Sequence, residues 1–381
     1  MYGLRPSAPG LEGIDLTTID DREVARRNFL ATAGLADARR EPMSGDASTR
    51  AYERLHLTGG ATRVFMDQPP ALETAVAAPD ATPDQRRALG YNALTRLAGG
   101  RVDAFAAVSA YLRSRGFSAA AVETFDAGQG FAVLEDLGDD LYARLIERGQ
   151  AARPLYETAV DLQIALHAEA APTVLTAPGA NWALSTYDDL ALRTYTDMFL
   201  EWWPKYAGIP PLPDDAHTEW EALAAPIRQR GEVGASVFAH RDFHAENLIW
   251  LPKRTGLARV GLLDFQDAVR AHPAWDLLHL LQDARRDVAP ELEAAMLERY
   301  LAARPSVDRD AFMADYRGLA ALNAARILGP IFARQVVAFG KRRYIEFMPR
   351  TWRYLERNLA HPDLAELRGW FDRWLPPESR A

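Results

Sequence analysis

Apolar residues gather in short strand-like runs in the first third of the chain and at helical spacing beyond it. Ala51–Leu57 and Arg63–Asp67 are two strand-like runs, and the Gly-Gly turn between them is typical of a β-hairpin. Val122–Phe125 and Phe131–Leu134 flank a glycine-containing turn and predict a second hairpin. We therefore expect a small β-sheet in this part of the chain.

Helical periodicity accounts for most of the remaining sequence. Residues 21–34 follow cap-like aspartates and end at a glycine, and 101–115 carry apolar residues three to four positions apart, so both are predicted helices. Beyond Gly138 the chain is predicted to be mostly helical, apart from a strand-rich island at 235–270. The long helical segments are expected at 151–170, 184–203, 214–230, 291–303, 308–328 and 331–358.

This change of pattern divides the chain into three predicted parts. Residues 1–20 hold glycines, prolines and acidic residues without a helical period, and we expect a flexible tail there. Residues 21–135 are expected to form a small N-terminal lobe around the sheet, and 136–381 a larger, mostly helical lobe. The predicted fold class is α+β with two lobes, and a crevice between lobes is a natural place for a ligand.

Composition narrows the class of protein and its partners. Of the 381 residues, 48% are hydrophobic and 25% are charged, which is typical of a globular chain with a sizeable core. The net charge of −8 argues against a nucleic-acid partner, and the absence of cysteine excludes disulfides, thiolate metal sites and cysteine nucleophiles. Neither a signal-peptide core nor an apolar run of membrane-spanning length occurs, so we expect a cytoplasmic, monomeric protein without a membrane partner.

Two aspartates and an asparagine stand in a pattern that suits phosphoryl transfer. Asp242 follows the strand-like run VFAH, Asn247 comes five residues later, and Asp264 ends the apolar run VGLL. Phosphoryl transfer needs a carboxylate to orient the acceptor hydroxyl and hard oxygen ligands for Mg²⁺. We therefore predict Asp242 as the catalytic base and Asn247 and Asp264 as magnesium ligands. The alternative is that the aspartates are turn and cap residues.

Three residues near this pattern each allow two interpretations. His240 and His244 are four residues apart and could form a metal pair, but we favour a structural role for His240 in holding the loop. Asp276 begins an apolar helix after a proline-containing loop, and it is either a helix cap or an anchor for the catalytic-loop backbone. We favour the anchor.

A run of small polar residues before the first hairpin is a candidate phosphate-binding loop. Small residues let backbone N–H groups approach phosphate oxygens, and hydroxyl groups and an arginine add contacts, although such a run can also be an ordinary turn. The segment LEDLG is the expected hinge, which would meet the adenine edge through its backbone at Glu135 and Leu137. The loop residues predicted to bind ATP are Ser44, Gly45, Asp46, Ser48 and Arg50.

Six segments carry a resemblance to a known family: SGDASTRAY (44–52), FMDQPP (65–70), LEDLGDD (134–140), HRDFHAENL (240–248), LDFQDAVRAHPAWDLLHLLQD (263–283) and ILGPIFARQVVAFGKRRYIEFMPR (327–350). They resemble the aminoglycoside/choline-kinase-like phosphotransferases. More narrowly, they are similar to the bacterial anomeric N-acetylmuramate/N-acetylglucosamine kinases of cell-wall recycling. The resemblance implies a protein-kinase-like fold with a nucleotide-binding N-terminal lobe. It also implies transfer of the γ-phosphate of ATP, with Mg²⁺, to the anomeric hydroxyl of one or both sugars.

The chain departs from the broader kinase pattern where the phosphates are held. Such kinases use a strand lysine paired to a helix glutamate. The corresponding strand, RVFMDQPP, has no lysine, and the candidate partner helix 101–115 has no glutamate. The narrower sugar-kinase group carries MD-x-PP at this place. We expect Arg50 or Arg63 to supply the missing positive charge.

Charged and aromatic residues supply candidates for the acceptor site. Residues 321–357 hold eight Lys or Arg against two acidic residues, which favours the carboxylate-bearing N-acetylmuramate and disfavours polycationic aminoglycosides. Most of these cations are expected on a solvent-exposed helix face, with one or two at the site. The predicted substrate-binding residues are Glu201, Trp202, Gln266 and Arg326; for the tryptophan, a core position is the alternative.

Two other functions stay open on this evidence. The acceptor could instead be an aminoglycoside, choline or a homoserine-like alcohol, on the same fold. The missing lysine–glutamate pair also allows a nucleotide-binding pseudokinase that serves as a partner or regulatory module, although Asp242, Asn247 and Asp264 are all present.

Overall fold

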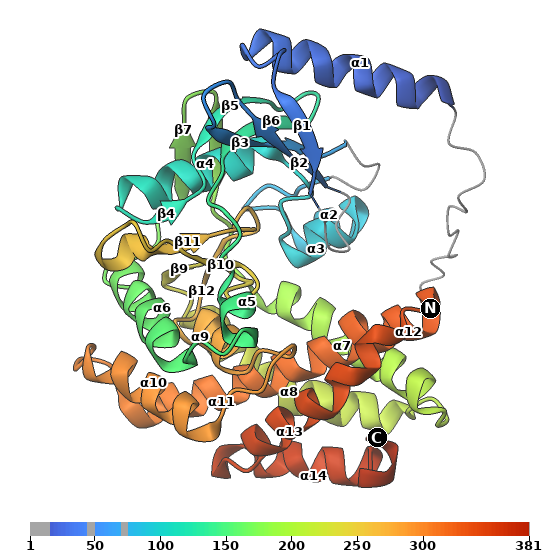
Figure 1. Cartoon of the computed structure of the whole chain (residues 1–381). Helices are drawn as coiled ribbons and strands as arrows, with labels where there is room; N and C mark the ends of the chain where they lie inside the picture. The colour runs from blue at the N-terminus through green and yellow to red at the C-terminus, as the bar shows by residue number, and fades with distance from the viewer. Residues whose placement is uncertain (1–15, 44–49, 70–74, 381) are drawn as a thin grey trace. The chain divides into compact units, whose positions relative to one another are not determined.

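The computed structural model of the chain describes residues 16–43, 50–69 and 75–380 (Figure 1). Their contacts divide them into two compact units, which are described separately below. The first unit contains the described residues of Met1–Pro70 and Val122–Asp136, and the second contains those of Ala71–Ala121 and Leu137–Ala381.

An antiparallel sheet of five strands forms most of the first unit. Both predicted hairpins are present, as β2–β3 and β5–β6, and β3 pairs with β6 to join them. The edge strand β1 was not predicted, because its sequence RREP has no apolar residue besides the proline. In spatial order the strands are β1 (Arg39–Pro42), β2 (Ala51–His56), β3 (Thr62–Asp67), β6 (Phe131–Glu135) and β5 (Val122–Asp126).

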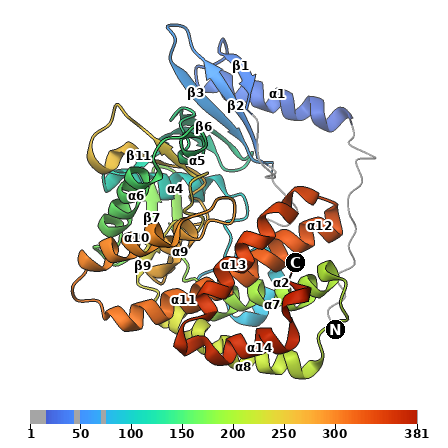
Figure 2. The same cartoon turned by 60° about the horizontal axis from the view of Figure 1, so that its bottom comes forward.

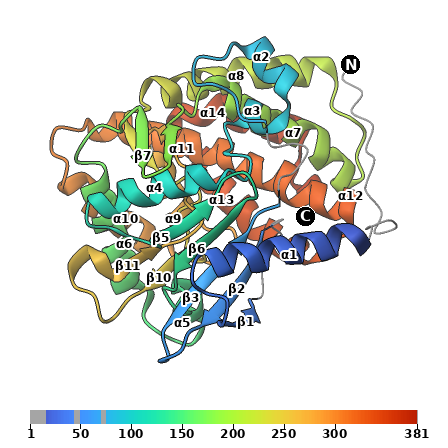
Figure 3. The same cartoon turned by 90° about the horizontal axis from the view of Figure 1, so that it is seen from above.

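Helix α1 (Leu16–Thr32) lies along one face of this sheet (Figure 3). Its Leu30 packs with Leu55, Phe65 and Phe131 in the hydrophobic core of the unit. The helix begins at Leu16, so the predicted start at residue 21 is too late, and the end of the predicted tail is helical. The aspartates that suggested a cap lie inside the helix, beyond its first turn.

Helices dominate the second unit, which confirms the predicted α+β class. Figure 2 shows α7, α8, α11, α13 and α14 gathered in one helical region. No helix within residues 16–43, 50–69 and 75–380 is long and apolar enough to span a membrane. The α-helices are α2 (Pro83–Leu89), α3 (Tyr91–Thr95), α4 (Val102–Ser114), α5 (Tyr142–Glu147), α6 (Ala152–Leu166), α7 (Asp189–Ala207), α8 (Asp214–Val233), α9 (Ala274–Leu281), α10 (Pro290–Ala302), α11 (Arg309–Arg326), α12 (Arg334–Phe339), α13 (Met348–Leu359) and α14 (Ala365–Trp374).

Two predicted helices have different bounds in the structure. The predicted segment 331–358 is not one helix, because Gly340 adopts a left-handed conformation that ends α12. The chain continues through a 3₁₀ segment into α13. Instead of starting at residue 184, α7 starts after Asp188, whose side chain accepts a hydrogen bond from the backbone of Ala191.

Short strands in the second unit place the loops that matter for chemistry. The predicted strand-rich island is confirmed, and its strands form two small sheets with the orders β10-β11-β4 and β12-β9. A third small sheet, the hairpin β7–β8, was not predicted. These strands are β4 (Ser118–Ala119), β7 (Val174–Ala177), β8 (Ala180–Ala183), β9 (Val237–Ala239), β10 (Leu248–Trp250), β11 (Val260–Leu262) and β12 (Val269–Ala271).

The compact units differ from the predicted lobes in one segment. Residues 75–121 group with the helical unit, although they were expected in the N-terminal lobe. The reason is that α4 packs against β7 and β8, and β4 pairs with β11. The helix packed on β3 is therefore α1.

A buried ion-pair cluster fixes the segment before α4 to the start of α7. The carboxylate of Asp188 accepts from both terminal nitrogens of Arg86, at 2.5 and 3.0 Å, and from Arg96 at 3.1 Å. Both arginine side chains are almost completely buried. The same carboxylate also caps α7, so one residue joins three elements.

Replacing Asp188 with alanine should therefore be costly. We expect the free energy of unfolding to fall by about 3–5 kcal/mol, because two buried guanidinium groups lose their counter-charge. Urea titration of the wild type and Asp188→Ala would measure this. The exposed pair of Arg87 and Asp84 provides the matched control, and Asp84→Ala should leave stability nearly unchanged. Equal effects of the two variants would contradict the expectation.

Candidate active site

A short loop between β9 and β10 carries the central residues of the candidate site. The backbone carbonyl of Asp242 accepts from the amide nitrogen of the Asn247 side chain, at 2.9 Å, and from the backbone N–H of His244. The loop is thus closed on itself, and Asn247 is held by its nitrogen rather than by its amide oxygen. This leaves the oxygen as the group that can serve a metal.

Asp276 anchors this loop through the backbone. It lies in α9, and its carboxylate accepts from the backbone N–H of His240 at 2.6 Å and of Arg241 at 2.9 Å. Gln163 adds a weaker contact at 3.4 Å. Asp276 therefore binds two consecutive N–H groups of the loop, the geometry expected of an anchor. Burial raises the pKa of Asp276 to about 6, although the groups that donate to it act in the opposite direction.

The end of β11 lies beside the loop and presents Asp264. The ring nitrogen Nε2 of His240 is 2.8 Å from the carbonyl oxygen of Leu263, whose own N–H donates to the carbonyl of Asn247. The candidate metal ligands thus sit on neighbouring backbone segments. Gln266 donates to Asp264 at 3.2 Å and to Asp267 at 2.9 Å.

Arg241 is buried beside Asp242 and fixes the loop from a second direction. Its guanidinium donates to the carbonyl oxygens of Arg96 at 2.9 Å and Thr95 at 2.8 Å, and lies 3.3 Å from the hydroxyl of Tyr195. Its backbone has a φ of 81°, which is left-handed and costs about 1–2 kcal/mol for a residue with a side chain. The side-chain contacts hold this conformation in place.

Non-glycine residues with a positive φ are also concentrated around this loop. Within residues 16–43, 50–69 and 75–380, the non-glycine residues with positive φ are Arg96, Arg241 and Asp264. Two of them are hydrogen-bonded to each other and the third is the candidate metal ligand. Such strained backbone is concentrated at functional sites, where surrounding contacts impose it.

The carboxylate of Asp242 is partly open to solvent, with 35% of its side chain exposed, and is flanked by two nitrogens. Nη2 of Arg326 is 3.9 Å from Oδ1, and Nδ1 of His279 is 3.8 Å from the same atom. Burial acts to raise the pKa of Asp242, but the positive charge of Arg326, with contributions from the histidines and Arg241, outweighs it. The pKa of Asp242 is therefore held well below its usual range.

His279 is neutral at neutral pH, because burial and the neighbouring Arg326 lower its pKa well below 6.5. It was not predicted as a site residue. The available signal was its spacing from Asp276, since residues three apart lie on one face of a helix and both are polar in an otherwise apolar α9. One face of α9 thus supports the loop backbone and lies beside the carboxylate of Asp242.

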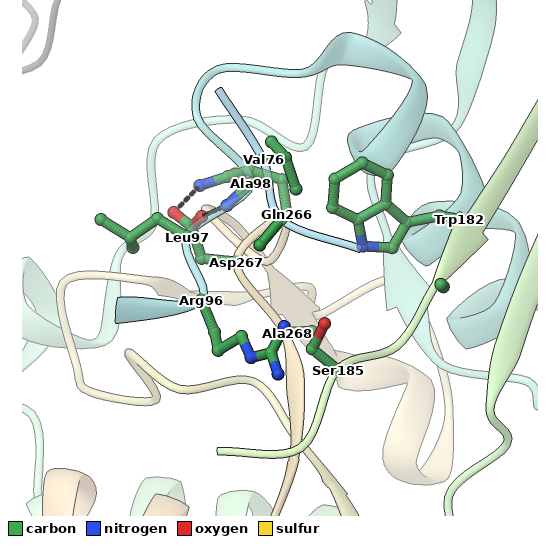
Figure 4. A pocket seen from close by; sticks show the side chains of 11 residues that line it. Val76, Arg96, Leu97, Ala98, Trp182, Ser185, Gln266, Asp267 and Ala268 are labelled. Atoms are coloured by element: carbon green, nitrogen blue, oxygen red, sulfur yellow. Dashed lines mark hydrogen bonds between the residues drawn. The ribbon is translucent and has the colours of Figure 1, made fainter. Parts of the chain in front are cut away.

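The predicted acceptor residues fall in different surroundings. Arg326 lies beside Asp242, as described above. Gln266 is buried and bonded to its neighbouring aspartates, and Figure 4 shows it beside Asp267, which accepts from the backbone of Ala98. The small pocket in that view is also lined by Trp182 and is too small for a sugar ring.

Glu201 and Trp202 belong to a separate surface of α7. Glu201 pairs with Lys205 at 2.6 Å, and the ring of Trp202 lies between the cations of Lys205 and Arg334, at 4.5 and 5.9 Å. Among the described residues, neither has a contact with Asp242. Their roles in binding an acceptor stay predictions.

The predicted nucleotide contacts are only partly within the described residues. Ser44, Gly45, Asp46 and Ser48 lie outside them. Arg50 donates to Gln68 at 2.7 Å and Glu135 ends β6, both in the first unit, whereas Leu137 begins the long stretch of the second unit. These assignments also stay predictions.

The contacts of β3 explain the missing lysine in part. Asp67 is buried on this strand and pairs with Arg22 and Arg26 of α1, so the strand carries the carboxylate and the helix the cations. Of the two suggested substitutes, Arg63 is engaged by Glu123 on the adjoining part of the sheet.

The donor set at the loop fits a magnesium ion. Mg²⁺ is usually held by one or two carboxylates together with substrate phosphates and water, and Asn247 and Asp264 provide hard oxygen atoms of this kind. No group of three or more His, Asp or Glu side chains suited to a metal occurs in the described part of the chain. The alternative of a metal pair at His240 and His244 is disfavoured by their contacts, because Nε2 of His240 lies 2.8 Å from the carbonyl oxygen of Leu263 and Nε2 of His244 lies 3.3 Å from Nη1 of Arg285.

The chain has an antiparallel sheet unit, a helical unit and an anchored loop, His240-Arg241-Asp242, with Asp264 beside it. These features define a small-molecule phosphotransferase of the kinase-like fold. The chain belongs to the phosphotransferase enzyme family, whose model matches residues 39–322. It is 59% identical to the N-acetylmuramate/N-acetylglucosamine kinase of Caulobacter vibrioides over 96% of this chain and 100% of that protein. The kinase of the same description from Pseudomonas aeruginosa is 29% identical over 86% of each chain.

Solved structures agree on the fold. The ethanolamine kinase of Plasmodium vivax superposes with a TM-score of 0.54 at 11% identity, covering 94% of this chain and 91% of that one. The choline kinase of Streptococcus pneumoniae gives a TM-score of 0.52 at 14% identity, covering 88% and 99%. The predicted kinase-like fold and family are thereby confirmed, and the chain is an enzyme of the phosphotransferase class.

The raised pKa of Asp276 predicts a pH dependence of stability. Its pKa is about 6 in the folded chain against the ordinary 3.8, so the folded state binds this proton more tightly than the unfolded state. The stabilisation from this group is complete below about pH 4 and is lost as the pH rises through 6. Asp276→Asn removes the titration, so the stability advantage of the wild type over this variant should shrink from pH 4 to pH 7.

Urea titrations of both proteins at several pH values would measure this difference. We expect a change of about 1.4 kcal/mol for each unit of pKa shift. Asp84→Asn, at an exposed position, serves as the control. A difference that stays flat or grows with pH would show that the carboxylate is not strained by burial.

Proposed function

We propose that this protein is an ATP-dependent kinase that phosphorylates the anomeric hydroxyl of N-acetylmuramate or N-acetylglucosamine, giving the sugar 1-phosphate. The observation that carries the proposal is the ionised Asp242 on a doubly anchored loop, next to the candidate metal ligands Asn247 and Asp264. The description of the relative at 59% identity supports both sugars as candidate acceptors. A role in cell-wall recycling agrees with these substrates.

In the proposed mechanism, Asp242 accepts a hydrogen bond from the acceptor hydroxyl and takes its proton as the oxygen attacks the γ-phosphorus of ATP. The bond from the γ-phosphorus to the bridging oxygen breaks, and ADP leaves. An anomeric hydroxyl is more acidic than an ordinary alcohol, so a carboxylate is a suitable base. Asp276 and Arg241 keep the backbone of the loop fixed during this step, because each holds it through hydrogen bonds. Little covalent chemistry is needed beyond positioning and charge stabilisation.

The proposal includes one cofactor and a simple set of partners. Asn247 and Asp264 would hold Mg²⁺ by their side-chain oxygens, and the metal would neutralise the phosphate charge. The predicted nucleotide residues Ser44 to Arg50, Glu135 and Leu137 are part of the proposal for ATP. We further propose that the protein acts as a cytoplasmic monomer without nucleic-acid or membrane partners.

The two alternative functions have less support. An aminoglycoside or choline acceptor would agree with the fold alone, since the choline and ethanolamine kinases share no more than 14% identity with this chain. A pseudokinase would not need an ionised aspartate held between a guanidinium and an imidazole. Activity as an amino-sugar kinase is therefore the function that we propose.

Replacing Asp242 with asparagine tests the catalytic base. We expect kcat with either sugar to fall by about 10²–10⁴-fold, because asparagine cannot accept the proton. Coupled measurement of ADP release with a panel of sugars would record this, and nucleotide binding should persist in the variant. Asp214→Asn, at the exposed start of α8, is the matched control that should keep full activity.

The chemistry of the product gives an independent check. Phosphate at the anomeric carbon removes the reducing end, so the product should fail a reducing-sugar assay. A phosphorylated product that still reduces copper would rule out the anomeric position. Full activity of Asp242→Asn would rule out the proposed base, and ATP binding without turnover on any alcohol would favour the pseudokinase.

A further inference from the structure

Arg326 is the last residue of α11 and is buried, with 7% of its surface exposed. Among the described residues it donates a single hydrogen bond, from Nη1 to the side-chain oxygen of Asn323 at 3.0 Å. Within the same part of the chain its Nε has no hydrogen-bond partner, and Nη2 is 3.9 Å from Asp242, which is too long for a hydrogen bond. A guanidinium has five N–H groups, and among the described residues only Nη1 of this group has a hydrogen-bond partner.

A buried charge with so few hydrogen bonds is costly unless a ligand completes it. Asp242 compensates the charge only in part, and the acceptor hydroxyl requires this carboxylate as well. The ring of Tyr195 lies 4.8 Å from the guanidinium carbon and covers one face of the group. Nη2 is the guanidinium nitrogen that lies toward Asp242, and it is the atom from which a bound acceptor would receive a hydrogen bond.

The backbone around Arg326 is held tightly, which suits a recognition residue. The chain passes directly from α11 into a π-helical segment, Ile327–Ala333, a rare conformation that is frequent at functional sites. Within it, Gly329 approaches α7 so closely that a Cβ atom there would lie 2.4 Å from the Cα of Phe199. Arg326 is thus fixed against the helix that also carries Tyr195.

The charge of the surrounding segment also favours an anion. Residues 326–343 hold five basic and no acidic residues, in a chain whose net charge is −8. A planar guanidinium matches a carboxylate through two parallel hydrogen bonds. Of the two proposed acceptors, N-acetylmuramate carries a carboxylate and N-acetylglucosamine does not.

We propose that Arg326 binds the carboxylate of the acceptor and so makes the enzyme prefer N-acetylmuramate over N-acetylglucosamine. This inference rests on the proposed function, in which Asp242 is the base for a sugar hydroxyl. It assigns Arg326 to acceptor selection, in contrast to a role in holding the transferred phosphoryl group, which would serve both sugars equally.

The wild-type enzyme provides the first test without any variant. Steady-state kinetics would compare N-acetylmuramate with its primary amide, which has nearly the same size but no charge. We expect kcat/KM to be about 10- to 100-fold lower for the amide, mainly through KM, because a charged hydrogen-bonded pair is lost. Equal kcat/KM values for the acid and the amide would overturn the inference.

Substitution of Arg326 provides the second test. Arg326→Gln should lower kcat/KM for N-acetylmuramate more than for N-acetylglucosamine and should abolish the discrimination between acid and amide. Arg326→Lys, which keeps the charge without the planar fork, should fall between the two. Arg342→Gln is the matched control, because Arg342 belongs to the same basic segment but is exposed. It should keep the wild-type ratio.

The outcomes separate this inference from the function on which it rests. Equal losses with both sugars in Arg326→Gln would assign the arginine to the phosphoryl group or to Asp242, and the selection role would be wrong. If the wild type phosphorylated neither sugar while it still bound ATP, the proposed function itself would fail. If Arg326→Gln does not fold, the acid–amide comparison and Arg326→Lys still decide the question.

Discussion

The site depends above all on one buried carboxylate. Asp276 accepts the backbone N–H groups of His240 and Arg241, and thereby fixes two consecutive peptide units of the loop that carries Asp242. A charge in this position is costly, as its raised pKa of about 6 indicates. The cost is offset because both N–H groups would otherwise be buried without a partner. The direction of the Asp242 side chain follows from this anchoring.

The remaining restraints act on the same loop from other elements. Arg241 carries left-handed backbone strain and compensates for it with hydrogen bonds to the carbonyls of Thr95 and Arg96. The side chain of Arg96 is in turn held by Asp188 at the start of α7. A continuous set of polar contacts therefore connects α3, α7 and the catalytic loop. In such a network each residue positions the next, and Asp242 is the member left partly open to solvent.

The first unit shows how a kinase-like sheet can do without the usual strand lysine. Asp67 occupies the end of β3 and is neutralised by two arginines of α1, which packs on the sheet through Leu30. In this chain the strand therefore carries the carboxylate and the helix carries the cations. Of the two arginines that the sequence suggested for the missing phosphate contact, Arg63 pairs with Glu123 and Arg50 donates to Gln68, so both assignments stay predictions.

The sequence alone determined the α+β class, the hairpins and the strand-rich island, and it singled out Asp242, Asn247 and Asp264 as candidates, because turns, helical periods and a loop motif are local features. It could not determine that α4 belongs to the helical unit, nor that His279 and Arg326 flank the catalytic carboxylate. Asp276 and the loop that it anchors are 36 residues apart, and Arg326 lies still further along the chain. Such contacts form only when the helices pack, because packing brings together side chains that are far apart in the sequence and follow no periodic pattern. The motif thus predicted Asp242 as the base, and the tertiary structure decided the anchoring of its loop, the low pKa of its carboxyl and which side chains lie beside it.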